Sequence, residues 1–153
     1  MRRKYTVEIA LRNIEYIRRI RPEVNFTTDI MVGFPGENAE DFNETVKLIK
    51  AVRFLHTHIF KYSKRPGTEA AVMPDQIPET EKNNRASTLA KIQDNIKKEI
   101  YANINPNAPL AVLFETYENG IATGHTPNFL EISVASEKDI SGKIFEVKKS
   151  EIL

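Results

Sequence analysis

The residues with the strongest potential for chemistry lie in one short stretch from Thr27 to Glu37, TTDIMVGFPGE. The apolar and β-branched segment Asn25–Val32 predicts a strand that is buried on both faces. It runs into the sequence GFPG at residues 33–36, where Pro-Gly favours a tight turn and each glycine lets the backbone approach a ligand closely. Asn38 then predicts the N-cap of a helix with an acidic first turn. A ligand-binding βα unit and a βα turn that binds nothing are equal alternatives at this point.

A second group of candidates lies in and just after the next predicted strand, Phe54–Tyr62. Strand alternation places His56 and His58 on one face, and a His-x-His pair can bind zinc when further ligands lie nearby. Since the sequence offers only one more histidine, far along the chain, we expect no metal site here. Three cations lie at and after the end of this strand, and they could bind phosphate groups or pair with carboxylates: Lys61, Lys64 and Arg65.

Amphipathic helices are predicted around these two strands. Apolar residues recur at spacings of three and four in three stretches, which indicates helices over about residues 7–21, 39–52 and 78–103. Thr6 predicts the N-cap of the first helix, and Pro78 suits the first turn of the last one. Helices before, between and after two strands predict a parallel strand pair in an open or closed α/β sheet.

The pattern changes at Asn105–Pro109, NPNAP, which is the best candidate for a domain boundary. Beyond it apolar residues alternate, and Glu118-Asn119-Gly120 predicts a hairpin turn. Such short antiparallel strands predict a small β-barrel of the kind that often binds oligonucleotides. We therefore expect an α/β domain over residues 1–104 and an all-β domain over residues 108–153. The predicted strands of the second domain are residues 110–116, 121–124, 129–134 and 144–147.

Composition and charge limit the function classes. The 153 residues are 41% hydrophobic and include no cysteine, which excludes a disulfide framework and favours the cytoplasm. No apolar run approaches the roughly 20 residues that span a bilayer, and we expect no signal peptide. Residues 1–24 carry seven Lys and Arg against three Glu, whereas residues 108–153 carry four Lys against seven acidic residues. Attraction for RNA is therefore expected from the first part of the chain and from the loop that carries Lys61, Lys64 and Arg65. A solvated helix face is an equal alternative for the N-terminal charges.

Three ordered motifs resemble the radical S-adenosylmethionine (SAM) methylthiotransferases. Asp29–Glu37, DIMVGFPGE, resembles the fifth-strand motif of that family. Ahead of it, Met1–Thr6 is similar to the family segment M-x-R-x-Y-T, and after it His58–Thr68 is similar to H-x-F-x-Y-S-x-R-x-G-T. This version is most similar to the branch that acts on threonylcarbamoyladenosine in tRNA. The segment Gly124–Phe129 is similar to the TRAM domain that ends these enzymes.

The resemblance implies both a fold and a site. The chain is expected to supply the last two strands and helices of a radical SAM (βα) barrel, followed by a small TRAM-like β-barrel. The complete enzyme transfers a methylthio group to C2 of modified adenosine 37 in tRNA, beside the anticodon. Lys61, Lys64 and Arg65 would then contact the RNA, and no catalytic residue is implied. The implied SAM-binding residues are Asp29, Val32, Gly33, Phe34, Pro35 and Gly36.

The sequence departs from the family pattern in its cysteines. The family holds a [4Fe–4S] cluster on a C-x3-C-x2-C loop, because such clusters need thiolate ligands. This chain has no cysteine, so we expect it to be inactive alone and to need the N-terminal half of the enzyme. Its start at a methionine inside the family pattern is expected for a truncated reading frame or a trimmed gene product. The alternative function is a non-catalytic RNA-binding or interaction module, although the acidic balance of residues 108–153 argues against it.

Overall fold

The structure, a computed structural model, describes residues 5–153, which form two compact units. One unit comprises the residues up to Pro22 together with Phe26–Ile100. The other comprises Glu23–Asn25 together with Tyr101–Leu153. In the described part of the chain, no helix combines the length and the apolar composition needed to cross a membrane.

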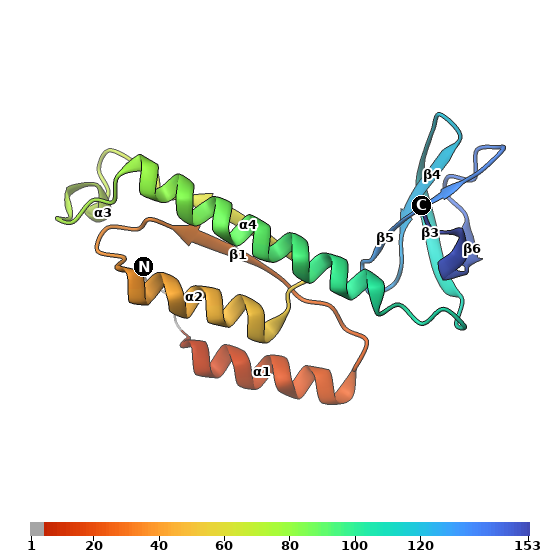
Figure 1. Ribbon diagram of the computed structural model, residues 1–153, viewed down its shortest axis with the longest axis horizontal. Helices are drawn as coiled ribbons and strands as arrows, with labels where there is room; N and C mark the ends of the chain where they lie inside the picture. Colours follow the sequence, from red (N-terminus) through yellow and green to blue (C-terminus); the bar gives the residue numbers. More distant parts are fainter. Residues whose placement is uncertain (1–4) are drawn as a thin grey trace. The chain divides into compact units, whose positions relative to one another are not determined.

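The first unit is a parallel strand pair with helices before, between and after its strands (Figure 1). β1 (Thr27–Val32) and β2 (His56–Lys61) pair in parallel, as the order of the predicted elements indicates. Part of the Met1–Thr6 motif, residues 1–4, lies outside the described residues. The helices are α1 (Val7–Ile20), α2 (Ala39–Val52), the single turn α3 (Glu69–Val72) and α4 (Glu79–Ala102), whose last two residues belong to the second unit.

Helices α2 and α4 cover one face of the strand pair. Val32 of β1, Ile49 of α2 and Leu89 of α4 are completely buried there, and Ile96 is nearly so. The spacing of apolar residues in both helices gathers them on the face that meets the strands. Burying each such side chain contributes on the order of 1.5–3 kcal/mol to stability. The partly buried residues around this core are Ile30, Phe42, Val46, Ile59, Ala86, Ile92 and Ile100.

The opposite face of the strand pair is exposed. Along β1 the exposed residues Asp29 and Met31 alternate with the more buried Ile30 and Val32. Phe60 lies opposite Met31 in the register and is 52% exposed. The prediction of a strand that is buried on both faces is therefore wrong. Only alternate side chains of the strand meet α2 and α4, and the exposed face carries the polar Thr27 and Asp29 together with Met31.

The second unit is an antiparallel sheet with strand order β5-β4-β3-β6. After the 3-10 helix η1 (Lys149–Glu151), Ile152 pairs with Val134 of the edge strand β5. Because Ile152 follows the other edge strand, this pairing links the two edges and curls the sheet. Its strands are β3 (Leu110–Glu118), β4 (Ile121–His125), β5 (Glu131–Ala135) and β6 (Ile144–Val147).

Two turns show where local sequence signals work and fail in this sheet. Asn119 and Gly120 have φ values of 51° and 81°, as the predicted two-residue hairpin requires. The prediction of a strand from Phe129 is wrong, because Phe129 has φ of 64° and β5 begins at Glu131. The hydroxyl and carbonyl of Thr126 hold this turn by accepting hydrogen bonds from the N–H groups of Leu130 and Phe129, each at 2.9 Å.

The shared core predicts a specific loss of stability. Leu89→Ala removes a completely buried side chain between α4 and the strands, so the free energy of unfolding is expected to fall by about 2–5 kcal/mol. Val72→Ala, at a side chain that is 85% exposed, is the control and is expected to change it by less than about 0.5 kcal/mol. Urea unfolding followed by far-UV circular dichroism measures both. Equal effects of the two substitutions would contradict this packing.

Candidate functional site

The carboxyl ends of β1 and β2 bring the two candidate loops to one edge of the strand pair. Val32 and Lys61, the last residues of the two strands, lie opposite each other in the register. One residue further on, the Tyr62 N–H donates to the Val32 carbonyl at 2.9 Å. The rings of Phe34 and Tyr62 then meet edge to face, with centroids 5.4 Å apart. The turn after β1 and the loop after β2 are therefore neighbours, at the end of the sheet where α/β folds bind ligands.

In and just after the turn at residues 33–36, the N–H groups of Gly33, Gly36 and Glu37 are hydrogen-bonded. Gly33 and Gly36 have φ values of 73° and 83°, which other residues rarely adopt. The Glu37 N–H donates to the Phe34 carbonyl at 2.9 Å, and the Gly36 N–H donates to the Asp75 carbonyl at 3.0 Å. The Gly33 N–H donates to the carboxylate of Glu37. Because these donors have partners, the turn does not present the cradle of N–H groups that binds phosphate.

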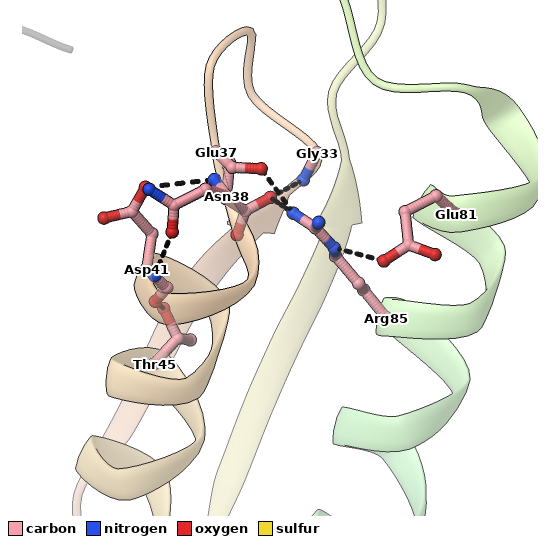
Figure 2. A network of polar contacts seen from close by, with 7 residues as sticks. All are labelled: Gly33, Glu37, Asn38, Asp41, Thr45, Glu81 and Arg85. Carbon is pink, nitrogen blue, oxygen red and sulfur yellow. Dashed lines mark hydrogen bonds and ion pairs between the residues drawn. The ribbon is translucent and has the colours of Figure 1, made fainter.

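The start of α2 is equally unsuited to an anion. The Asp41 N–H donates to the side-chain oxygen of Asn38 at 2.9 Å, and the Asn38 N–H donates to the Asp41 carboxylate at 3.0 Å (Figure 2). This capping box confirms the predicted N-cap. Glu40 and Asp41 also place two carboxylates in the first turn, where they compensate the positive end of the helix dipole. A ligand at this edge would meet carbonyl oxygens, carboxylates and aromatic surface.

The structure brings together four of the six implied SAM-binding residues. Gly33, Phe34, Pro35 and Gly36 form the turn itself, and the Pro35 side chain is buried. Val32 points its side chain into the core and can offer a ligand only its backbone. Together with Val32, the four turn residues form one continuous segment at the carboxyl end of β1.

Asp29 lies apart from that turn, on the exposed face of β1 and four residues before Gly33. It is opposite His58 in the register, and both side chains are exposed. The rings of His56 and His58 lie 4.3 Å apart along the same face. Within residues 5–153, no group of three or more His, Asp and Glu side chains is arranged to hold a metal ion.

The three candidate RNA-binding cations differ in their surroundings. Lys61 donates to the Glu79 carboxylate and to the Asn83 side-chain oxygen, each at 2.7 Å. The hydrogen bond from Lys61 lowers the pKa of Glu79 below its ordinary value of 4.5. Lys64 and Arg65 are exposed, and their side chains form no hydrogen bond or ion pair with any other residue of the range 5–153. Only these two of the three have cationic groups directly available to phosphate.

Two buried cations of α4, which the sequence analysis did not identify, also reach this edge. Arg85 is 7% exposed and pairs with Glu37 and Glu81 (Figure 2). Lys82 is 8% exposed, and its ammonium group donates to the Tyr62 carbonyl at 3.0 Å. Both residues lie on the same buried face of α4 as Leu89. Charged residues on the buried stripe of a helix are the signal that could have revealed them, because buried charges need partners.

Comparison with known proteins shows which proteins this chain is similar to. Residues 1–49 match the radical SAM superfamily. The threonylcarbamoyladenosine tRNA methylthiotransferase MtaB of Bacillus subtilis (strain 168) is 39% identical over 153 residues, which cover 97% of this chain and 34% of the relative. A tRNA-2-methylthio-N(6)-dimethylallyladenosine synthase of Endomicrobium trichonymphae is 39% identical over 151 residues, which cover 99% of this chain and 36% of the relative.

A further synthase of the second kind, from Thermobifida fusca (strain YX), is 46% identical over 99 residues, which cover 65% of this chain and 20% of the relative. The chain spans about a third of the length of the first two relatives. The resemblance predicted from the three motifs is confirmed by these similarities.

The Lys61–Glu79 pair predicts a change in acid titration. Lys61→Ala removes the main hydrogen bond that lowers the pKa of Glu79, so this pKa is expected to rise towards 4.5. Because the folded-state pKa is lowered, the pair contributes stability above the ordinary pKa and loses it as the pH falls through the folded-state value. Carboxyl carbon NMR over a pH series measures the shift. Lys64→Ala is the control, and an equal rise in that variant would contradict the pairing.

Proposed function

We propose that this chain, which is related over almost its whole length to radical SAM tRNA methylthiotransferases, supplies the C-terminal part of such an enzyme. It would contribute the last two strands of the SAM-binding barrel over residues 1–104 and a TRAM-like domain over residues 108–153. The observation that carries the proposal is the meeting of two family motifs at one edge, with the Phe34 and Tyr62 rings 5.4 Å apart.

The residues at this edge fit the adenosyl part of SAM. Adenine and ribose donate hydrogen bonds through amino and hydroxyl groups. The carbonyls of Val32 and Phe34 already accept hydrogen bonds, whereas those of Gly33, Pro35 and Gly36 accept none within residues 5–153 and are the acceptors that the turn offers. The positive φ values of Gly33 and Gly36 keep side chains away from the backbone surface. In this proposal the backbone of Val32–Gly36 contacts the cofactor. Asp29, on the exposed face of β1, would contact it from the barrel interior.

The residues of this chain do not fit a [4Fe–4S] cluster, because the chain has no cysteine to ligate iron. The cluster that supplies the radical chemistry of the family would therefore be held by the N-terminal half of the enzyme. The chain is expected to be inactive without that half. Its own role is to bind and orient SAM and tRNA.

The proposed substrate is threonylcarbamoyladenosine at tRNA position 37, methylthiolated at C2 in the cytoplasm. The segment His58–Thr68 supports this choice, since it resembles the branch that acts on this nucleoside. Lys64 and Arg65 in that segment have no partners within residues 5–153 and could bind phosphates of the anticodon loop.

A chimeric enzyme tests the proposed function. In it this chain replaces the matching third of the Bacillus subtilis relative, which supplies the N-terminal part. The chimera is produced in a strain that lacks the relative, and tRNA nucleosides are analysed by mass spectrometry. We expect 2-methylthio-threonylcarbamoyladenosine to reappear. The 153-residue chain alone is the control and is expected to restore none.

Each other outcome of this experiment is informative. A folded, cluster-loaded chimera that neither binds SAM nor modifies tRNA would overturn the proposal. Methylthiolation of dimethylallyladenosine instead would keep the enzyme class and overturn the proposed nucleoside.

The unpartnered cations also favour the alternative function, a non-catalytic RNA-binding module. It predicts that the 153-residue chain alone binds tRNA and loses affinity as salt increases. Lys64→Ala/Arg65→Ala is then expected to reduce the slope of log K against log salt by about 1 to 2 units, since two phosphate contacts are removed. Lys61→Ala is the matched control, because Lys61 is already paired with Glu79. Fluorescence anisotropy with labelled tRNA measures the slopes, and equal slopes in all variants would contradict a role for these two cations.

A further inference from the structure

We propose that Arg85 and Lys82 are positioning residues that hold both strand ends in the geometry for SAM binding, an inference that rests on the proposed function. They lie three residues apart in the first turns of α4, and both are more than nine-tenths buried. A chain of hydrogen bonds runs from Arg85 through the ends of β1 and β2 and returns to α4 at Lys82. We call it the strand-end network; its residues are Val32, Gly33, Glu37, Tyr62, Lys82 and Arg85.

The first half of the network fixes the end of β1. Arg85 Nη1 lies 2.9 Å from a carboxylate oxygen of Glu37 and donates to the Glu37 backbone carbonyl, also at 2.9 Å. The same carboxylate oxygen accepts the Gly33 N–H (Figure 2). Arg85 thereby holds the one side chain that binds the N–H group of Gly33.

The second half fixes the end of β2 and joins it to β1. The peptide unit between Val32 and Gly33 is held on both sides, because its N–H meets Glu37 and its carbonyl accepts the Tyr62 N–H at 2.9 Å. The carbonyl of Tyr62 accepts from Lys82 at 3.0 Å. The Lys82 ammonium group also lies 5.5 Å from the centre of the Tyr62 ring. The Tyr62 backbone is therefore held by β1 on one side and α4 on the other.

The network matters because the turn it holds is otherwise easily deformed. Gly33 and Gly36 have large conformational freedom, so their backbone geometry must be set by neighbours. A Cβ atom at Gly33 would lie 2.3 Å from Cγ of Lys82, which shows how closely α4 approaches this point. Orienting the peptide between Val32 and Gly33 also orients the carbonyl groups that follow it. Hydrogen-bond acceptors held in one geometry bind a ligand at lower entropic cost.

The partners of Arg85 stabilise its charged form. Burial, the largest influence, lowers the pKa of Arg85, but hydrogen bonds to Glu81 and Glu37 raise it above its ordinary value. The guanidinium also lies over the Phe42 ring, 5.4 Å from its centre. Its planar group can bind Glu37 and Glu81 at once, which a lysine ammonium group cannot do with the same geometry. Arg85→Lys therefore preserves the charge and tests the geometry.

The first measurement uses the 153-residue chain and does not depend on SAM. Glycine-selective ¹⁵N labelling leaves the amide signals of six glycines, one of them Gly33. Arg85→Met is expected to shift the Gly33 amide signal and to speed its hydrogen exchange by about tenfold or more, since a charge-assisted hydrogen bond is lost or loosened. Lys91→Met, an exposed cation on the same helix, is the matched control and is expected to leave Gly33 unchanged. An unchanged Gly33 signal in Arg85→Met would overturn the network.

The second measurement is SAM affinity in the chimeric enzyme. Arg85→Met is expected to weaken SAM binding about tenfold, and Arg85→Lys to weaken it less, because part of the charge-assisted pairing with Glu37 remains. Leu89→Ala controls for general destabilisation, since it alters the same helix without touching the network. If Leu89→Ala weakens SAM binding as much as Arg85→Met, the positioning role is overturned. Should Arg85→Met not fold, the comparison of Arg85→Lys with Lys91→Met decides the inference.

The two measurements separate the inference from the proposed function. No SAM binding by the unsubstituted chimera is a failure of the proposed function. Normal SAM binding by the unsubstituted chimera and by a folded Arg85→Met variant, with the Gly33 signal shifted, is a failure of the inference alone.

Discussion

The parallel alignment of β1 and β2 is the constraint on which the first unit depends. It places Val32 opposite Lys61 and so brings two loops, separated by a whole helix in sequence, to the same edge. Among residues 5–153, the hydrophobic core that supports this alignment lies on one side, where α2 and α4 bury Val32, Ile49 and Leu89. Side chains on the other face, such as Met31 and Phe60, are exposed. The strand pair is thus a scaffold with one face packed against helices and one face exposed.

The chemistry of the edge follows from which backbone groups are already used. The N–H groups of Gly33, Gly36 and Glu37 all bind within the chain, and the start of α2 carries its own carboxylates. A glycine turn before a helix is often an anion site. Here, however, these three N–H groups already donate to acceptors within the chain. Ligands that donate hydrogen bonds and stack on aromatic rings suit it better. The adenosyl group of SAM has this character, which supports the proposed contact with the cofactor.

Sequence periodicity predicted the helices and the parallel pair because helix faces and strand order are local properties. Sequence periodicity gave wrong predictions where tertiary packing decides the burial or the backbone conformation of a residue. The burial of β1 on one face depends on which helices cover it, and the φ of Phe129 depends on the hydrogen bonds of Thr126. Motif similarity predicted a SAM contact at the turn, which stays a prediction, and it did not point to Arg85 or Lys82, whose partners are distant in sequence. Lys61 was grouped with Lys64 and Arg65, and only the structure separates them through Glu79.

The most direct test of the central claim is hydrogen–deuterium exchange of the chimeric enzyme with and without SAM, read by mass spectrometry at the peptide that spans residues 32–38. We expect SAM to slow exchange in this segment and around Tyr62, while exchange in the β3–β6 sheet stays the same. SAM binding that leaves residues 32–38 unchanged would contradict the assignment of this edge as the cofactor-contacting surface.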